Sequence, residues 1–155
     1  MDEEFMAEAI RLSVEKMQEM EGGPFGAVIV RNGRIIARGW NRVTSTNDPT
    51  AHAEIVAIRE ACRELNNFWL GDCRIYVSCE PCPMCLAAIY WAGIRQLYYA
   101  AERKDAAEVG FGDEYIYNEI IKPIGDRNLE MTQMMREKAL AAFAIWDTME
   151  NKIEY

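Results

Sequence analysis

The stretch S78-C-E-P-C-P-M-C85 carries three of the five cysteines of the chain, spaced three residues apart. Cysteines at this spacing occur in iron–sulfur proteins, thiol-redox proteins and zinc sites. A ferredoxin-type run requires a further cysteine at position 89, where this chain has Ile89, so an iron–sulfur cluster is poorly supported. A redox pair formed by Cys82 and Cys85 remains an alternative, because the Cys-Pro-Met-Cys order has the redox spacing and stands at a predicted helix start.

Hydrophobic periodicity on both sides of this stretch predicts an α/β fold. Asn32-Gly33 is a strong signal for a tight hairpin between the first two strands. The later strand–helix–strand spacing predicts right-handed parallel crossovers, with helices on both faces of the sheet. We expect strands over residues 25–30, 34–40, 74–79 and 96–101, a short strand around Leu129, and helices over residues 2–20, 52–65, 83–91, 113–121 and 133–150.

Length and composition predict a single compact domain with one sizeable core, because the chain has 155 residues, half of them hydrophobic. No segment reaches the roughly 18 consecutive apolar residues of a membrane span, and the acidic N-terminus does not fit a signal peptide. Five cysteines without a secretory signal argue against a disulfide framework, so we expect a soluble, cytoplasmic protein. The net charge of −8 argues against a nucleic-acid partner, because such a surface repels phosphate.

The segment P49-T-A-H-A-E54 contains His52, the only histidine of the chain. A lone histidine is more often structural, but this one precedes an acid by two residues at a predicted helix start. With Cys82 and Cys85 it offers one imidazole and two thiolates, which leaves the fourth tetrahedral position of a zinc ion for water. This open arrangement is that of a catalytic zinc site, whereas a structural site would have a fourth protein ligand.

The predicted helix starts favour metal binding by these residues. Pro83 suits the first position of a helix, which places Cys82 at the N-cap and Cys85 in the first turn. The partial positive charge of a helix N-terminus stabilises both sulfurs as thiolates. Zinc lowers the pKa of a bound water to near 7, and Glu54 is predicted to accept the proton of that water and return it to the substrate.

The order H52-A-E54 followed by P81-C-P-M-C85 matches the zinc-deaminase signature H-x-E…P-C-x-x-C. The chain resembles the cytidine-deaminase-like superfamily of zinc hydrolases and, within it, the bacterial guanine deaminases. The stretches that carry this closer resemblance are G22-G-P-F-G-A-V-I-V30, N47-D-P-T-A-H-A-E54, S78 to W91, D105-A-A-E-V-G-F111 and N151-K-I-E-Y155.

The resemblance implies a three-layer α/β/α sandwich whose mixed sheet has about five strands and starts with an antiparallel hairpin. It also implies one zinc ion per chain and hydrolysis of guanine to xanthine and ammonia. The alternatives are related deaminases that act on guanosine, cytosine, an aminotriazine or adenosine in tRNA, and a thiol-redox protein of a different class. The acidic surface weighs against tRNA.

Four residues are predicted to bind the substrate around the zinc. Asn41 offers an amide suited to a purine edge, although a loop asparagine that caps a turn is the alternative. Phe25 is placed to stack on a purine, or else belongs to the core. Ala53 lies between the predicted zinc ligand and the acid. Trp91, at the end of the metal-side helix, lines the pocket or else has a packing role.

The resemblance further implies a second acid and a swapped tail. Asp113 is predicted to contact the base and to move protons to the departing amine, with Glu114 as the alternative and a helix-capping role as the simpler explanation. Members of the family exchange their C-terminal segments between subunits, so residues 133–155 are expected to be swapped within a homodimer. Tyr155 would then close over the active site of the partner subunit.

Overall fold

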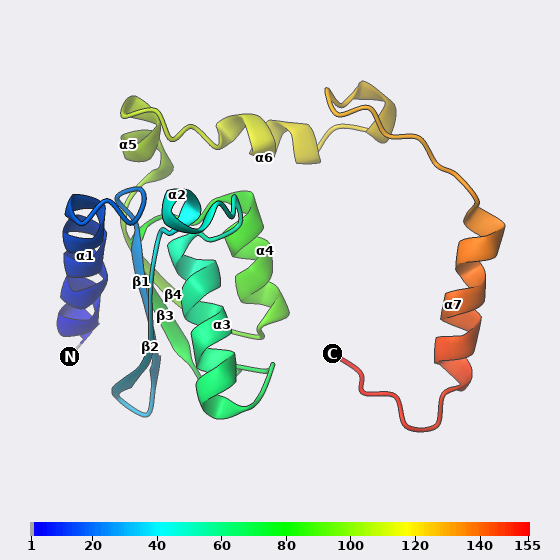
Figure 1. Cartoon of the computed structure of the whole chain (residues 1–155), viewed down its shortest axis with the longest axis horizontal. Helices are drawn as coiled ribbons and strands as arrows, with labels where there is room; N and C mark the ends of the chain where they lie inside the picture. Colours follow the sequence, from blue (N-terminus) through cyan, green and yellow to red (C-terminus); the bar gives the residue numbers. More distant parts are fainter. Residues whose placement is uncertain (1) are drawn as a thin grey trace. The chain divides into compact units, whose positions relative to one another are not determined.

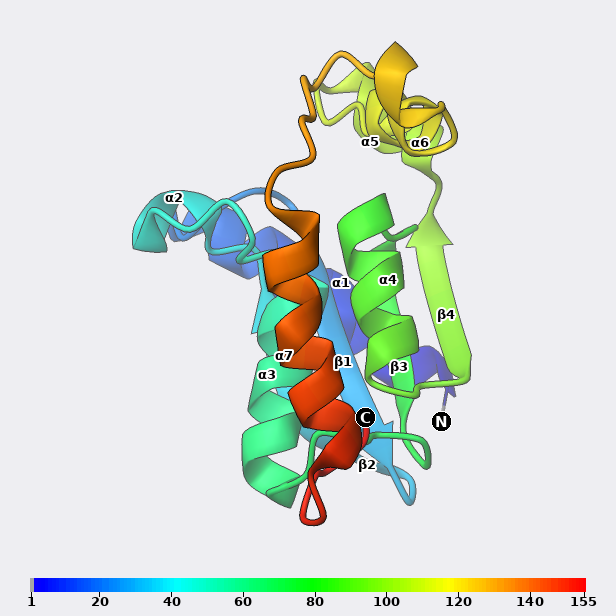
Figure 2. The same ribbon diagram turned by 90° about the vertical axis from the view of Figure 1, so that its right-hand side faces the viewer.

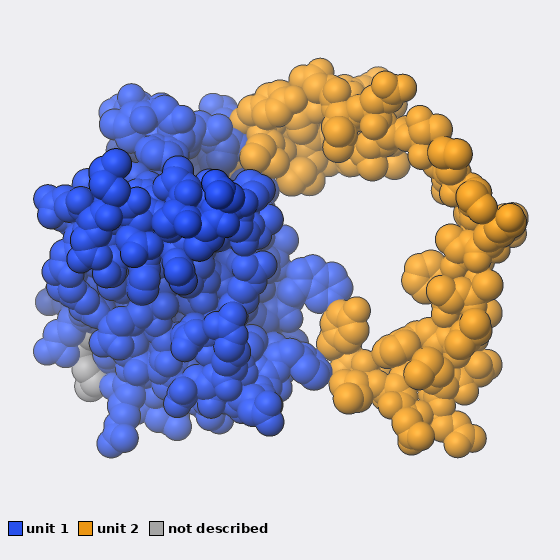
Figure 3. Space-filling model, in the orientation of Figure 1, with its two compact units in different colours: residues 1–114 blue, residues 115–155 orange. Residues whose placement is uncertain are grey.

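The computed structural model describes residues 2–155. The chain divides into two compact units, residues 1–114 and residues 115–155 (Figure 3). Strands and helices alternate along the first unit, much as the sequence predicts (Figure 1). Its elements are α1 (Asp2–Gln18), β1 (Gly26–Arg31), β2 (Arg34–Trp40), α2 (Val43–Thr46), α3 (Ala53–Leu65), β3 (Arg74–Cys79), α4 (Pro83–Trp91), β4 (Gln96–Ala101) and α5 (Arg103–Glu108).

Two short helices, α2 and α5, lie outside the predicted elements. The sequence of α5, R103-K-D-A-A-E108, has no apolar periodicity. The helix begins instead with a capping box. The Glu102 side chain accepts the backbone N–H of Asp105, and the Asp105 side chain accepts the backbone N–H of Glu102. Periodicity misses such a helix because the cap, and not an apolar face, defines it.

The four strands form one mixed sheet in the order β2-β1-β3-β4. Strand β1 pairs antiparallel with β2 and β3, and β3 pairs parallel with β4. Asn32 and Gly33 have φ values of 51° and 72°, as a type I′ turn requires, so the predicted hairpin is confirmed. The expectation of a fifth strand around Leu129 is wrong for residues 2–155, because that segment has no neighbouring strand to receive its backbone hydrogen bonds.

The first unit has three layers, with α1 on one face of the sheet and α3 and α4 on the other (Figures 1 and 2). Side chains alternate between the faces along each strand. In β1, Ala27 and Ile29 pack under α3 and α4, whereas Val28 and Val30 pack against α1. The predicted α/β/α sandwich is therefore confirmed, with a buried core on each side of the sheet.

The register of the sheet brings the ends of several strands together at one end of the sheet. Gly26, at the start of β1, pairs with Trp40, at the end of β2. Cys79, at the end of β3, pairs with Ala101, at the end of β4. The residues next to these four positions, which include most of the predicted site, therefore share one end of the sheet.

The second unit contains most of α6 (Glu114–Ile120), a 3-10 turn labelled η1 (Ile124–Asp126) and α7 (Arg136–Thr148). None of its described residues is buried. A chain segment without a core of its own needs another surface to cover its apolar side chains. No helix within residues 2–155 is both long and apolar enough to cross a bilayer.

Candidate metal centre

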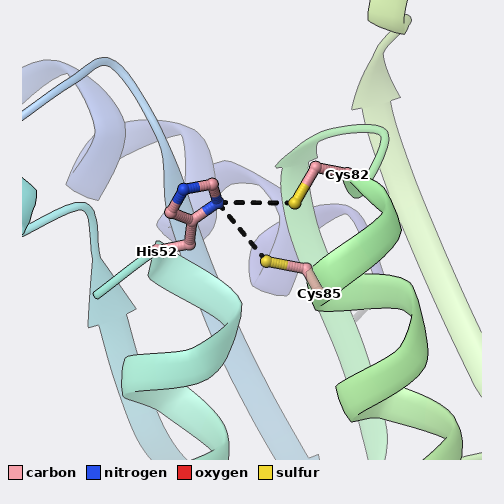
Figure 4. Close-up of side chains that lie close together, drawn as sticks. All are labelled: His52, Cys82 and Cys85. Carbon is pink, nitrogen blue, oxygen red and sulfur yellow. Dashed lines mark hydrogen bonds between the residues drawn. The ribbon is translucent and has the colours of Figure 1, made fainter. Parts of the chain in front are cut away.

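His52, Cys82 and Cys85 lie together at the end of the sheet where the predicted site falls (Figure 4). The Nδ1 atom of His52 is 3.5 Å from the Sγ atom of Cys82 and 3.5 Å from that of Cys85. The possible ligand atoms of the three residues all lie within 4.8 Å of one another. The structure thus brings together the three residues that the sequence predicts as metal ligands.

Two helix starts position these ligands. His52 is the N-cap of α3, and Cys82 is the N-cap of α4 with Pro83 at the helix start, so both positions agree with the sequence prediction. Both N-cap residues have extended backbone dihedral angles. Cys85 lies in the first turn of α4 and is fully buried. Because the first turns of two helices meet here, the imidazole and the thiols converge at one point.

The geometry of this centre fits zinc. Zinc binds nitrogen at about 2.0 Å and sulfur at about 2.3 Å, so two such ligands on one tetrahedral ion lie roughly 3.5 Å apart. The two nitrogen–sulfur distances of 3.5 Å have this value. A mixed nitrogen and sulfur donor set is also the set that zinc prefers, and three protein ligands leave one coordination position open.

The thiols are prepared for metal binding. A hydrogen bond from Cys85, followed by one from His52, lowers the pKa of Cys82 to about 4 despite its partial burial. The same hydrogen bond to Cys82, together with burial, raises the pKa of Cys85. Cys82 is therefore the thiolate of the pair and Cys85 the thiol, and a metal that displaces the Cys85 proton completes a pair of thiolates.

Glu54 lies in the first turn of α3, two residues after His52, and its side chain is 7% exposed. Burial is the main cause that raises the pKa of its carboxyl group. The Cys85 thiol acts on the same carboxyl group in the opposite direction and lowers its pKa by less. A buried carboxyl group with a raised pKa beside a metal centre is suited to accept and return a proton near neutral pH.

The other three cysteines are not part of the metal centre. The Cys79 thiol is buried and donates to the backbone oxygen of Glu102 at 3.7 Å. Burial raises the pKa of Cys79 and of Cys73 to about 11, so both remain thiols. Cys62 packs against the core on the α3 side. All three are therefore thiols of the core or of its margin.

Asn41 and Phe25 lie next to each other at the same end of the sheet. The Asn41 backbone N–H donates to the Phe25 oxygen at 3.0 Å. The Oδ1 atom of Asn41 accepts the backbone N–H groups of Gly23 at 3.1 Å and Val43 at 3.2 Å. The turn-capping role is therefore present, but it uses only the oxygen of the amide. Gly22 permits this packing, because a Cβ atom there would lie 2.2 Å from the Asn41 backbone oxygen.

Asp113 is half-buried, and Glu114 is exposed. Burial, with a smaller contribution from the Cys82 thiolate, raises the pKa of Asp113. The charge of Asp113 in turn acts on His52. Of the two acids, Asp113 is the one whose charge interacts with the metal centre, although its role in proton transfer stays a prediction.

The other residues predicted to contact the substrate are Ala53, Trp91 and Tyr155. Ala53 is buried, and its backbone packs against Gly39 of β2. Trp91 ends α4, about 13 Å along the helix from Cys82, and is 69% exposed. Tyr155 lies in the second unit and is 83% exposed. Contacts of these three residues with a substrate stay predictions.

The site also contains residues that sequence reasoning missed. Glu80 pairs with the Nε atom of Arg103 at 3.0 Å and accepts the backbone N–H of Arg103 at 3.2 Å. Ser78 accepts the backbone N–H of Gly26 at 3.0 Å and so joins β3 to the start of β1. Both Ser78 and Glu80 belong to the cysteine-rich stretch, which was the available signal. Phe111 packs against Phe25, and the residue is 44% exposed.

Residues 1–101 match the family model of the cytidine and deoxycytidylate deaminase zinc-binding region. The match contains His52, Glu54, Cys82 and Cys85. The chain therefore belongs to this family of zinc-binding deaminases, and the centre formed by His52, Cys82 and Cys85 is a zinc site.

Individual relatives extend the likeness to the whole chain. The guanine deaminase of Bacillus subtilis is 52% identical over 153 residues, which cover 99% of this chain and 98% of that protein. The crystal structure of guanine deaminase from Bacillus subtilis superposes with a TM-score of 0.96 at 52% identity, over 99% of this chain and 98% of that one. The tRNA-specific adenosine deaminase of Agrobacterium fabrum is 49% identical over 94 residues, or 61% of this chain and 62% of that protein.

Proposed function

We propose that this protein is a zinc-dependent aminohydrolase that converts guanine and water to xanthine and ammonia. The observation that carries the proposal is the buried carboxyl group of Glu54 beside the three zinc ligands. The likeness to the guanine deaminase of Bacillus subtilis supports guanine as the substrate, because it covers nearly the whole of both chains. The likeness to tRNA adenosine deaminases covers 61% of this chain.

Zinc, when bound by His52, Cys82 and Cys85, activates a water molecule as a nucleophile near neutral pH. Glu54 accepts the proton of that water, because its raised pKa makes it a stronger base than an exposed glutamate. It then delivers this proton to a ring nitrogen of the base, which makes the neighbouring carbon susceptible to attack. Burial of Glu54 keeps bulk water away from this exchange.

Asn41 holds the base in place. Its Oδ1 atom is already engaged by two backbone N–H groups, so the orientation of the amide is determined before a substrate arrives. The NH2 group then donates to an acceptor on the purine edge. The Phe25 ring contributes an aromatic surface beside the amide, and the backbone of Ala53 lies next to His52 at the start of α3.

Asp113 acts on the departing amine. Its half-buried position raises the pKa of its carboxyl group, and this favours the protonated acid, which can donate its proton. Ammonia leaves only after the amine has been protonated, so an acid near the zinc centre promotes this step.

An ammonia-release assay on the zinc-loaded protein tests the proposal. The panel contains guanine, guanosine, cytosine, an aminotriazine and a tRNA with adenosine at the edited position. We expect release with guanine at the highest kcat/KM of the panel. Preferred turnover of any other member would overturn the substrate assignment. A metal-free protein with a reversibly oxidised Cys82–Cys85 pair would support the thiol-redox alternative.

The quaternary part of the proposal concerns residues 115–155. Helix α7 exposes Phe143 and Ile145 at 69% and 64%, although apolar side chains of this size are normally covered. We infer that the protein is a homodimer and that residues 133–155 complete one deaminase domain by a swap between subunits, with Tyr155 over the active site of the partner. A cytoplasmic location is part of the same proposal, because a reducing compartment keeps the five cysteines as free thiols.

A further inference from the structure

Phe111 lies between two glycines, in the segment that joins α5 to the start of α6. Gly110 has a φ of +96°, and a Cβ atom at Gly110 or at Gly112 would meet no atom within 4 Å. Packing therefore does not explain why glycine occupies position 112. Glycine on both sides leaves the backbone of this segment with wide conformational freedom.

The side chain of Phe111 connects this segment to the end of the sheet. Its ring meets the Phe25 ring edge to face, with the centroids 5.0 Å apart and the planes at 90°. A Cβ atom on Gly23 would lie 3.4 Å from Cε1 and from Cζ of Phe111, so the ring also lies against the backbone of Gly23. Gly23 is the residue whose N–H is accepted by Asn41. Phe111 thus rests on the loop that carries Phe25 and that is hydrogen-bonded to Asn41.

Two residues further on, Asp113 is half-buried, and its charge acts on His52. The backbone between Phe111 and Asp113 consists of Gly112 alone. The position of the Asp113 carboxylate therefore depends on an anchor close to it, and the Phe111 ring is such an anchor. The backbone of the segment is held on its other side, where the N–H groups of Gly110 and Phe111 donate to Ala107 and Ala106 of α5 at 3.1 and 3.0 Å.

We propose that Phe111 is a positioning residue, which clamps the Gly110–Asp113 segment onto Phe25 and Gly23 and so fixes the position of Asp113. This inference rests on the proposed function of Asp113 in deamination. Displacement of a catalytic group by about 1 Å can lower a rate about 10²-fold, so loss of the ring would affect turnover although Phe111 itself does not take part in proton transfer.

The experiment compares Phe111→Ala with Phe111→Tyr, which keeps the ring, and with Val109→Ala, which removes an exposed apolar side chain from the same segment. For Phe111→Ala we expect a full zinc content and a kcat for guanine lower by about tenfold to 10²-fold. Phe111→Tyr and Val109→Ala should keep kcat within about twofold of the parent, because both leave the clamp in place.

A double-mutant cycle with Asp113→Asn separates positioning from a structural role. If Phe111 acts through Asp113, Phe111→Ala should lower kcat much less in the Asp113→Asn background than in the parent. Equal losses in both backgrounds, or loss of zinc from Phe111→Ala, would overturn the inference.

Amide hydrogen exchange of the zinc-loaded protein without substrate gives a measurement that does not depend on the reaction. Phe111→Ala should speed exchange at residues 110–113, while the amides of α3 and α4 exchange as in the parent. Unchanged exchange at residues 110–113 would refute the clamp. Faster exchange in a protein that does not deaminate guanine would instead retain the clamp and refute the proposed substrate.

Discussion

The Nδ1 atom of His52 lies 3.5 Å from the Sγ atom of Cys82, although 30 positions of sequence separate the two residues. Each of them is the N-cap of its helix, so the contact joins the start of α3 to the start of α4. The zinc centre therefore depends on how these two helices lie on one face of the sheet.

Substitution Cys82→Ala should abolish stoichiometric zinc binding, because two protein ligands remain and neither can compensate for the lost thiolate. Zinc content per chain, measured after gel filtration, tests this. Cys62→Ala is the matched control, since Cys62 packs against the core away from the centre and should leave zinc at one per chain. A Cys82→Ala protein that retains a full equivalent of zinc would contradict the ligand assignment.

Substitution Glu54→Gln should keep zinc and lower kcat by about 10² to 10⁴-fold, because the amide cannot accept or return a proton. Ammonia release and zinc content are measured on the same sample. Glu60→Gln, on the exposed side of the same helix, should retain parental activity. If the zinc-loaded Glu54→Gln protein is as active as the parent, Glu54 has no part in proton transfer.

Substitution Asn41→Asp separates the two functions of this side chain. The carboxylate still accepts from Gly23 and Val43, so the thermal midpoint should stay within a few degrees of the parental value. The lost NH2 donor should lower kcat/KM for guanine by about tenfold or more. Asn41→Ala removes both interactions and should lower stability as well. An Asn41→Asp variant with parental kcat/KM would show that the amide nitrogen does not bind the base.

Mixing of two inactive variants tests the swapped tail. When Glu54→Gln and Tyr155→Ala subunits form a mixed dimer, a tail that acts on the partner leaves one site with both Glu54 and Tyr155. Activity should therefore rise on mixing, toward the level of one parental site per dimer. A tail that acts within its own chain leaves no such site, and mixing would then restore nothing.

Much of the fold can be predicted from local patterns. Strand β1 alternates between two buried faces, and the Asn32-Gly33 turn adopts the positive φ values that its residue types favour. The bounds predicted for β2, β3, α4 and β4 are those observed. The expected strand around Leu129 failed because strand formation depends on a neighbouring strand, which the residue pattern of one segment does not reveal. Helix α5 was missed because its cap, and not its side-chain pattern, defines it.

The sequence by itself determined which side chains could bind zinc, since one histidine and a Pro-Cys-x-x-Cys run restrict the donor set, and helix-start residues place both at N-caps. Only the tertiary structure decided that these caps meet, that Glu54 is buried beside them, and that Phe111 and Asp113 approach from a segment some 60 positions away. The physical reason is that donor chemistry and capping are local properties of the chain. Burial and long-range approach arise only when the layers pack on the sheet.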